Sequence, residues 1–120
     1  INYHRNVDNM AEMMARADLA IGGGGTTIWE RCCLGLPSLV IVIAQNQAES
    51  TAFLDNKGII HSLGEHENVT HQQIYKAIKE FNMTPSRLRE ISGMGLELVD
   101  GKGSQRVEQL VTEFMFEQSV

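Results

Sequence analysis

The chain has 120 residues, a formal net charge of −5 at pH 7, and 42% hydrophobic and 21% charged residues, a composition typical of one globular domain. Its ten basic residues are spread along an acidic chain, which argues against a general affinity for nucleic acid. The longest apolar run, residues 39–44, is far shorter than the ~20 residues of a membrane helix, so we expect no membrane partner.

The first elements alternate between helix and strand. Asp8 predicts the cap of a helix, and the apolar residues at positions 10, 13, 14 and 17 predict one buried stripe along it. A short apolar run over residues 19–21 stops at four consecutive glycines, residues 22–25. Such a run bounded by glycine is typical of a buried strand that leads into a tight loop.

A second helix and a second strand follow the glycines. Thr27 and Glu30 have the spacing of a capping box, in which each side chain bonds the other residue's backbone N–H. Gly35 and Pro37 predict the end of this helix. Residues 39–43 are apolar at every position, which indicates a parallel strand buried on both faces.

The remaining elements complete an α/β unit. We expect a helix over residues 48–56, a strand over residues 59–63, and a helix capped by Thr70 and Gln73. Pro85 predicts the first turn of the next helix, and Ser104 the cap of a last one, whose apolar residues are Val107, Leu110, Val111 and Phe114. The fold class is therefore α/β, a Rossmann-like parallel sheet with helices on both faces.

The cysteines and histidines do not predict a metal site. Cys32 and Cys33 are adjacent, a spacing that fits neither a redox pair nor a zinc site, so we expect reduced thiols in a cytoplasmic protein. The histidines at positions 61, 66 and 71 fall on a strand end, a loop and a helix start. We expect no metal and no cofactor, and we expect Arg31 to be solvated or paired on the surface.

The glycines at positions 22–25 predict a ligand loop. Parallel sheets bind ligands beyond the carboxyl ends of their strands, and glycine followed by a helix start lets backbone N–H groups approach an anion. The loop lacks the lysine of a triphosphate P-loop, and Thr27 replaces the third glycine of the dinucleotide fingerprint. A phosphate is the expected ligand; the alternative is a tight turn that binds nothing.

Residues 17–37, together with Asn46 and Gln47, resemble the UDP-sugar hydrolases of the pseudaminic acid pathway. The most specific part is residues 29–37, Trp-Glu-Arg-Cys-Cys-Leu-Gly-Leu-Pro. The family is similar in its two-domain GT-B fold to the UDP-GlcNAc transferase of peptidoglycan synthesis. The resemblance implies that residues 1–120 are part of a carboxyl-terminal UDP-binding domain, with no catalytic residue in this chain and the histidine base in an amino-terminal domain.

The resemblance also implies a set of binding residues. Gly24, Gly25, Thr26 and Thr27 would bind the diphosphate, Glu30 the ribose, and Asn46 and Gln47 would lie near the phosphate and sugar. Gly23 and Gln45 depart from the hydrolase pattern, in which we expect Ala and Asp, and this weakens the case for the sugar contacts. For Glu30, the alternative is the capping box, because a side chain folded onto Thr27 could not also bind a ribose.

Two classes of function remain open. The first is the UDP-binding part of a sugar-nucleotide hydrolase, and the second is the donor domain of a GT-B glycosyltransferase or a non-catalytic domain that acts through a partner. If the resemblance holds, the first strand of the sheet lies outside the chain. We then expect an open sheet edge that is free to pair with another chain, and with it self-association or marginal stability.

Overall fold

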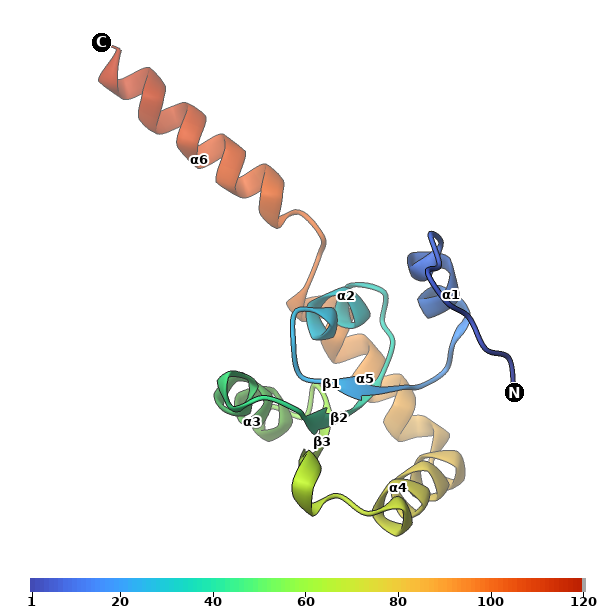
Figure 1. The fold of residues 1–120 in the computed structure, drawn as a ribbon. Helices are drawn as coiled ribbons and strands as arrows, with labels where there is room; N and C mark the ends of the chain where they lie inside the picture. The colour runs from blue at the N-terminus through green and yellow to red at the C-terminus, as the bar shows by residue number, and fades with distance from the viewer. Residues whose placement is uncertain (120) are drawn as a thin grey trace.

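The computed structural model describes residues 1–119. The elements follow in the order α1 (Met10–Arg16), β1 (Ala20–Gly23), α2 (Thr27–Cys33), β2 (Ser38–Val42), the 3-10 turn η1 (Gln45–Gln47), α3 (Ala48–Asn56), β3 (His61–Glu65), the 3-10 turn η2 (His66–Asn68), α4 (His71–Met83), α5 (Pro85–Leu98) and α6 (Gly103–Gln118). The three strands are parallel in the order β1-β2-β3 (Figure 1). The α/β class and the parallel sheet are therefore confirmed.

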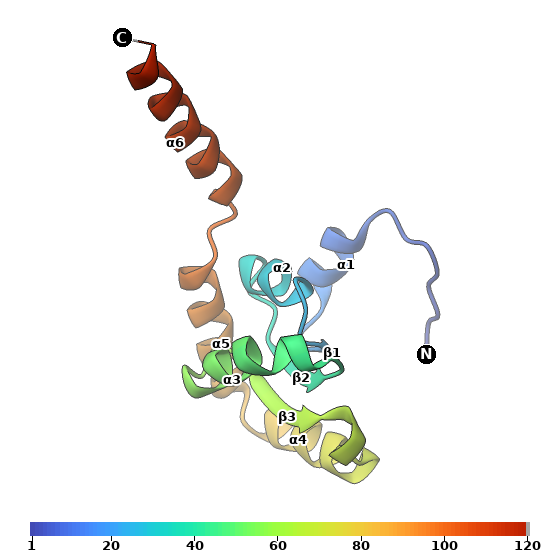
Figure 2. The ribbon, with the colours of Figure 1, turned by 60° about the vertical axis from the view of Figure 1, so that its left-hand side comes forward.

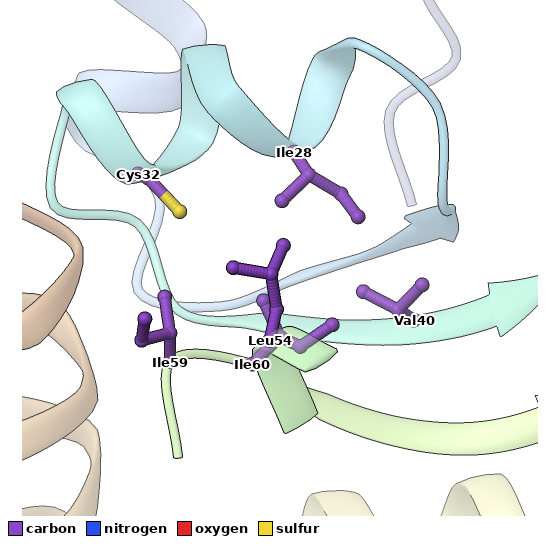
Figure 3. Close-up of a cluster of buried hydrophobic side chains, with 6 residues drawn as sticks. All are labelled: Ile28, Cys32, Val40, Leu54, Ile59 and Ile60. Atoms are coloured by element: carbon purple, nitrogen blue, oxygen red, sulfur yellow. The ribbon is translucent and has the colours of Figure 1, made fainter. Parts of the chain in front are cut away.

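One face of the sheet packs against α2 and α3. Ile28 and Cys32 of α2 meet Val40 of β2 and Leu54 of α3 in a buried cluster, which Ile59 and Ile60 complete (Figure 3). Both cysteines are free thiols, as expected. Burial raises the pKa of the Cys32 thiol, because a thiolate is poorly solvated among apolar side chains.

The other face packs against α4 and α5. Leu39 of β2 is fully buried against Ala77, Phe81 and Ile91. Because neighbouring residues of a strand point to opposite faces, Leu39 and Val40 anchor different layers of helices. This arrangement confirms that β2 is a strand buried on both faces.

Two strand boundaries differ from the prediction. β1 extends to Gly23 because Gly22 and Gly23 pair with Val40 and Ile41 of β2. β3 begins at His61 and not at residue 59, because the backbone of Ile59 still bonds to α3. Its N–H donates to the Leu54 carbonyl at 3.0 Å. The pairing of β2 with β3 then shifts between Val40 and Ile41, a local irregularity that periodicity does not reveal.

The predicted starts of α4 and α5 agree with the structure, whereas the predicted caps of α1 and α6 do not. Thr70 and Gln73 form the expected capping box, and Pro85 occupies the first turn of α5. The caps assigned to Asp8 and Ser104 are wrong, because α1 follows Asn9 and α6 follows Lys102, and neither helix has a side-chain cap. At both sites the helix begins within a residue or two of the expected position.

The helices at the two ends of the described chain leave their apolar stripes uncovered. α1 has no buried residue, so its predicted buried stripe is wrong. α6 also has none, and it extends away from the sheet in both views (Figures 1 and 2). Its apolar residues, Val107, Leu110, Val111 and Phe114, are 51–65% exposed. Helical periodicity located α6 correctly but did not show whether another element covers it.

Among residues 1–119, no helix is both long and apolar enough to cross a membrane.

Candidate functional site

The candidate site lies at the edge of the sheet where the strands end. The glycine loop, residues 22–25, begins with the last two residues of β1 and leads toward α2, and residues 43–44 and η1 connect β2 to α3 (Figure 2). Parallel strands place their carboxyl ends at the same edge, so these two segments lie side by side. The site is therefore formed by two consecutive strand-to-helix connections.

Gln47 links the two connections. Its Oε1 atom accepts hydrogen bonds from the N–H groups of Gly24 and Ile43, each at 3.3 Å. Because Oε1 is the acceptor in both bonds, Nε2 is the donor end of the amide, and it lies 3.4 Å from where a Cβ atom of residue 25 would be. The Gln47 amide thus holds the glycine loop against β2 and presents N–H donors beside Gly25.

The turn into α2 carries unpaired backbone donors. The Gly25 and Thr26 carbonyls accept from Ile28 and Trp29 at 3.1 and 3.0 Å, which closes the first turn of the helix. Within the part of the chain that the structure describes, the N–H groups of Gly25, Thr26 and Thr27 have no acceptor. Three adjacent donors without a partner, close to the Gln47 amide, form a surface suited to an anion.

Glu30 is not part of a capping box. Thr26, not Thr27, precedes α2, and no side chain caps that helix. Glu30 is exposed, and its carboxylate has no hydrogen-bond partner or ion pair within residues 1–119. The carboxylate is therefore available to a ligand one helical turn beyond the free N–H groups. Asn46 is exposed in η1, and its side chain makes no hydrogen bond to any other residue of the part of the chain that the structure describes.

Arg31 is buried, so the expectation of a solvated or surface-paired side chain is wrong. It is 9% exposed, its guanidinium lies over Gly22, and Nη1 donates to the Gly23 carbonyl at 3.4 Å. Burial lowers the pKa of this guanidinium, because the charged form loses solvation. A Cβ atom at position 22 would collide with the guanidinium, so the glycine there makes room for the buried arginine. Gly22 is therefore the sequence feature that could have predicted the burial of Arg31.

The cavities of the molecule do not all lie at this edge. A cavity of about 170 Å³ lies between the ends of β2 and β3, lined in part by Ile43, Gln45 and His66. A larger cavity, about 520 Å³, lies around Asp18, Pro37 and Arg89, at the opposite edge, where the strands begin. It contains no element of the glycine loop.

Metal-ligand chemistry finds no support in the arrangement of side chains. Across residues 1–119, no group of three or more His, Cys, Asp or Glu side chains is placed to hold a metal ion. His61 packs edge-on against Phe81, whereas His66 bonds the Val42 carbonyl at 3.3 Å through Nδ1. These two histidines thus contact different neighbours.

Comparisons with known proteins place this geometry in a family. Residues 1–102 match the model of the glycosyltransferase family 28 C-terminal domain. The chain is 33% identical over 114 residues to the spore coat polysaccharide biosynthesis protein SpsG of Bacillus subtilis, covering 94% of this chain and 33% of that protein. It is 29% identical over 112 residues to the UDP-N-acetylglucosamine--N-acetylmuramyl-(pentapeptide) pyrophosphoryl-undecaprenol N-acetylglucosamine transferase of Lactococcus lactis, covering 89% and 31%. The chain spans about a third of the length of these curated relatives.

Proposed function

The chain belongs to the glycosyltransferase family 28 C-terminal domain family, and from this premise we propose that it binds the nucleotide part of a UDP-linked sugar. The observation that carries the proposal is the row of free N–H groups at Gly25, Thr26 and Thr27, beside an uncommitted Glu30 carboxylate. Two observations support uridine as the base: the resemblance of residues 17–37, and the name of the Lactococcus lactis relative, a UDP-N-acetylglucosamine-dependent transferase.

We assign the parts of the nucleotide by chemistry. Diphosphate oxygens accept from the N–H groups of residues 25–27 and the hydroxyls of Thr26 and Thr27, where no protein acceptor competes. Gly24 lies beside them, but its N–H is already bonded to Gln47. The Glu30 carboxylate can accept from two adjacent ribose hydroxyls. The amides of Asn46 and Gln47 then lie toward the β-phosphate and the sugar. Gln47 acts through its Nε2 donor, since its oxygen is already bonded to Gly24 and Ile43.

A titration of this chain with UDP tests the site directly. We expect amide NMR signals of residues 22–30 and 46–47 to shift with UDP, and those of residues 24–27 alone to respond to inorganic phosphate. ADP and CDP serve as matched controls for the base. Absence of any UDP response would contradict the proposal, and an equal response to all three nucleotides would contradict the specificity for uridine.

The reaction of the parent protein is a separate proposal. We propose a UDP-sugar hydrolase that releases UDP from a diacetamido-trideoxy sugar in pseudaminic acid synthesis, based on the resemblance of residues 17–47. The names of the relatives favour equally a donor domain of a glycosyltransferase in polysaccharide synthesis. In either case the chain supplies the nucleotide site, and an amino-terminal domain supplies the catalytic groups.

The two reactions differ in what happens to the sugar when the parent protein carries out one turnover. A hydrolase is expected to release UDP and free sugar from a UDP-linked acetamido sugar in water alone. A transferase is expected to leave the donor intact until an acceptor is added. Release of UDP without an acceptor supports the hydrolase, whereas release that depends on an acceptor supports the transferase.

The edge of the sheet at β1 is the proposed contact with the rest of the parent. β1 pairs with β2 alone among the described strands, and Ile21 at its centre is 46% exposed. An unpaired strand edge accepts a further strand. We propose that a segment of the amino-terminal part, or a second copy of the chain, pairs there.

A further inference from the structure

The hydroxyl of Thr51 lies beneath the glycine loop without a hydrogen-bond partner. Thr51 comes from α3 and is 1% exposed, and no donor or acceptor within residues 1–119 bonds its Oγ1. Buried polar groups are nearly always paired, because leaving one unpaired sacrifices its bonds to water. An orphaned hydroxyl at this position therefore calls for a partner that the free chain does not provide.

The hydroxyl points at the main chain of Gly24. A Cβ atom at position 24 would collide with Thr51 Oγ1, so only glycine lets the loop lie directly on this side chain. A threonine inside a helix commonly donates to the carbonyl four residues earlier, which is that of Gln47. Ser50 donates to that carbonyl at 3.3 Å instead. Thr51 is thus turned from its usual partner toward the loop.

Under the proposed function, the glycine loop is the segment whose bonding changes when a nucleotide binds. In the free chain it is tied to its surroundings by the Gly24 N–H bond to Gln47 and the Arg31 bond to the Gly23 carbonyl. A diphosphate would add bonds at Gly25, Thr26 and Thr27. The Thr51 hydroxyl already lies against Gly24, so the main chain of the glycine loop is the polar group next to it when the loop rearranges.

We propose that Thr51 is a positioning residue of the nucleotide site, whose buried hydroxyl donates to the main chain of the glycine loop when a nucleoside diphosphate is bound. This inference rests on the proposed function and adds a residue that neither the sequence motif nor the family match singles out. The free chain carries the unpaired hydroxyl, and the bound chain satisfies it. Binding and stability are therefore expected to respond to its removal in opposite directions.

The substitution Thr51→Val tests this separation because valine has nearly the same shape and lacks the hydroxyl. We expect about a three- to tenfold loss of affinity for UDP by calorimetry, the range for one neutral hydrogen bond. The thermal midpoint of the free chain is expected to stay the same or rise, since a methyl group replaces an unpaired hydroxyl. If the role of Thr51 were purely structural, the substitution would lower both the affinity for UDP and the thermal midpoint.

Two further variants control the experiment. Thr51→Ser keeps the hydroxyl and is expected to restore most of the affinity, whereas Ser50→Ala removes the exposed neighbouring hydroxyl and is expected to bind UDP like the unmodified chain. Equal affinity of the valine variant and the unmodified chain would overturn the role of Thr51 alone. Failure of the unmodified chain to bind UDP would overturn the proposed function and this inference together. If the valine variant does not fold, equal affinities of Thr51→Ala and Thr51→Ser would overturn the inference.

Discussion

The substitution Glu30→Ala is expected to weaken binding of UDP by about 10- to 100-fold. The proposed ribose contact consists of hydroxyl groups that donate to an ionised carboxylate, and hydrogen bonds to charged groups contribute about 1.5–3 kcal/mol; each 1.4 kcal/mol is about tenfold in affinity. Glu30 is exposed and has no protein partner among the described residues. The free energy of unfolding is therefore expected to change by less than about 0.5 kcal/mol.

The ribose itself provides the control for this variant. We expect 2′-deoxy-UDP to bind the unmodified chain more weakly than UDP does, and the Glu30→Ala variant to lose much of this preference. Glu97→Ala removes an exposed glutamate from α5, far along the chain from the site. This variant is expected to bind UDP and 2′-deoxy-UDP with the same affinities as the unmodified chain. A Glu30 variant that keeps the full preference for UDP would show that the ribose is bound elsewhere.

The two capping-box patterns show where local sequence stops predicting structure. Thr70 has an extended backbone, with φ −105° and ψ 158°, and its hydroxyl accepts from Gln73 as expected. At the other pattern the glycine loop starts the helical turn one residue early: Thr26 precedes α2 with φ −58° and ψ −24°. Thr27 is then inside the helix, where its side chain cannot cap. That outcome frees Glu30, which the sequence alone left open.

The position of the glycine loop was predictable, whereas its bonding was not. Four glycines between an apolar run and a helix start predict a loop at the end of a strand, and these features are local. The Gln47 bridge, the burial of Arg31 and the orphaned Thr51 hydroxyl join residues that are eight to 27 positions apart across two strand connections. Such contacts depend on how the helices pack on the sheet, and hydrophobic periodicity does not specify that packing.

The same limit applies to the apolar stripes. The apolar residues of β2 and of α6 look equally suited to burial in the sequence, yet Leu39 is fully buried and Leu110 is 65% exposed. A stripe shows only that a surface is able to be buried. Which stripes form the core depends on the elements that reach them, and within residues 1–119 no residue of α6 is buried.

Leu39→Ala is expected to produce the largest loss of stability, about 2–5 kcal/mol, because it leaves a cavity in the centre of the sheet. Leu39 is fully buried on the middle strand, against Phe81 and Ile91, so the surrounding helices cannot collapse fully onto alanine. A loss of this size is a large part of the ~5–15 kcal/mol that stabilises a typical domain. The difference in free energy of unfolding is measured by urea denaturation, with circular dichroism as the signal.

The matched control for this substitution is Ile43→Ala, just beyond the end of the same strand. Ile43 is 60% exposed, so its truncation is expected to cost less than about 1 kcal/mol. Equal losses for the two variants would contradict the view that β2 anchors both helical layers. Because Leu39 lies on the face opposite Val40 and Thr51, its truncation is expected to lower the folded fraction while leaving the UDP affinity of the folded chain unchanged. A substitution on one face of β2 is thus expected to change the stability of the chain without changing its affinity for UDP.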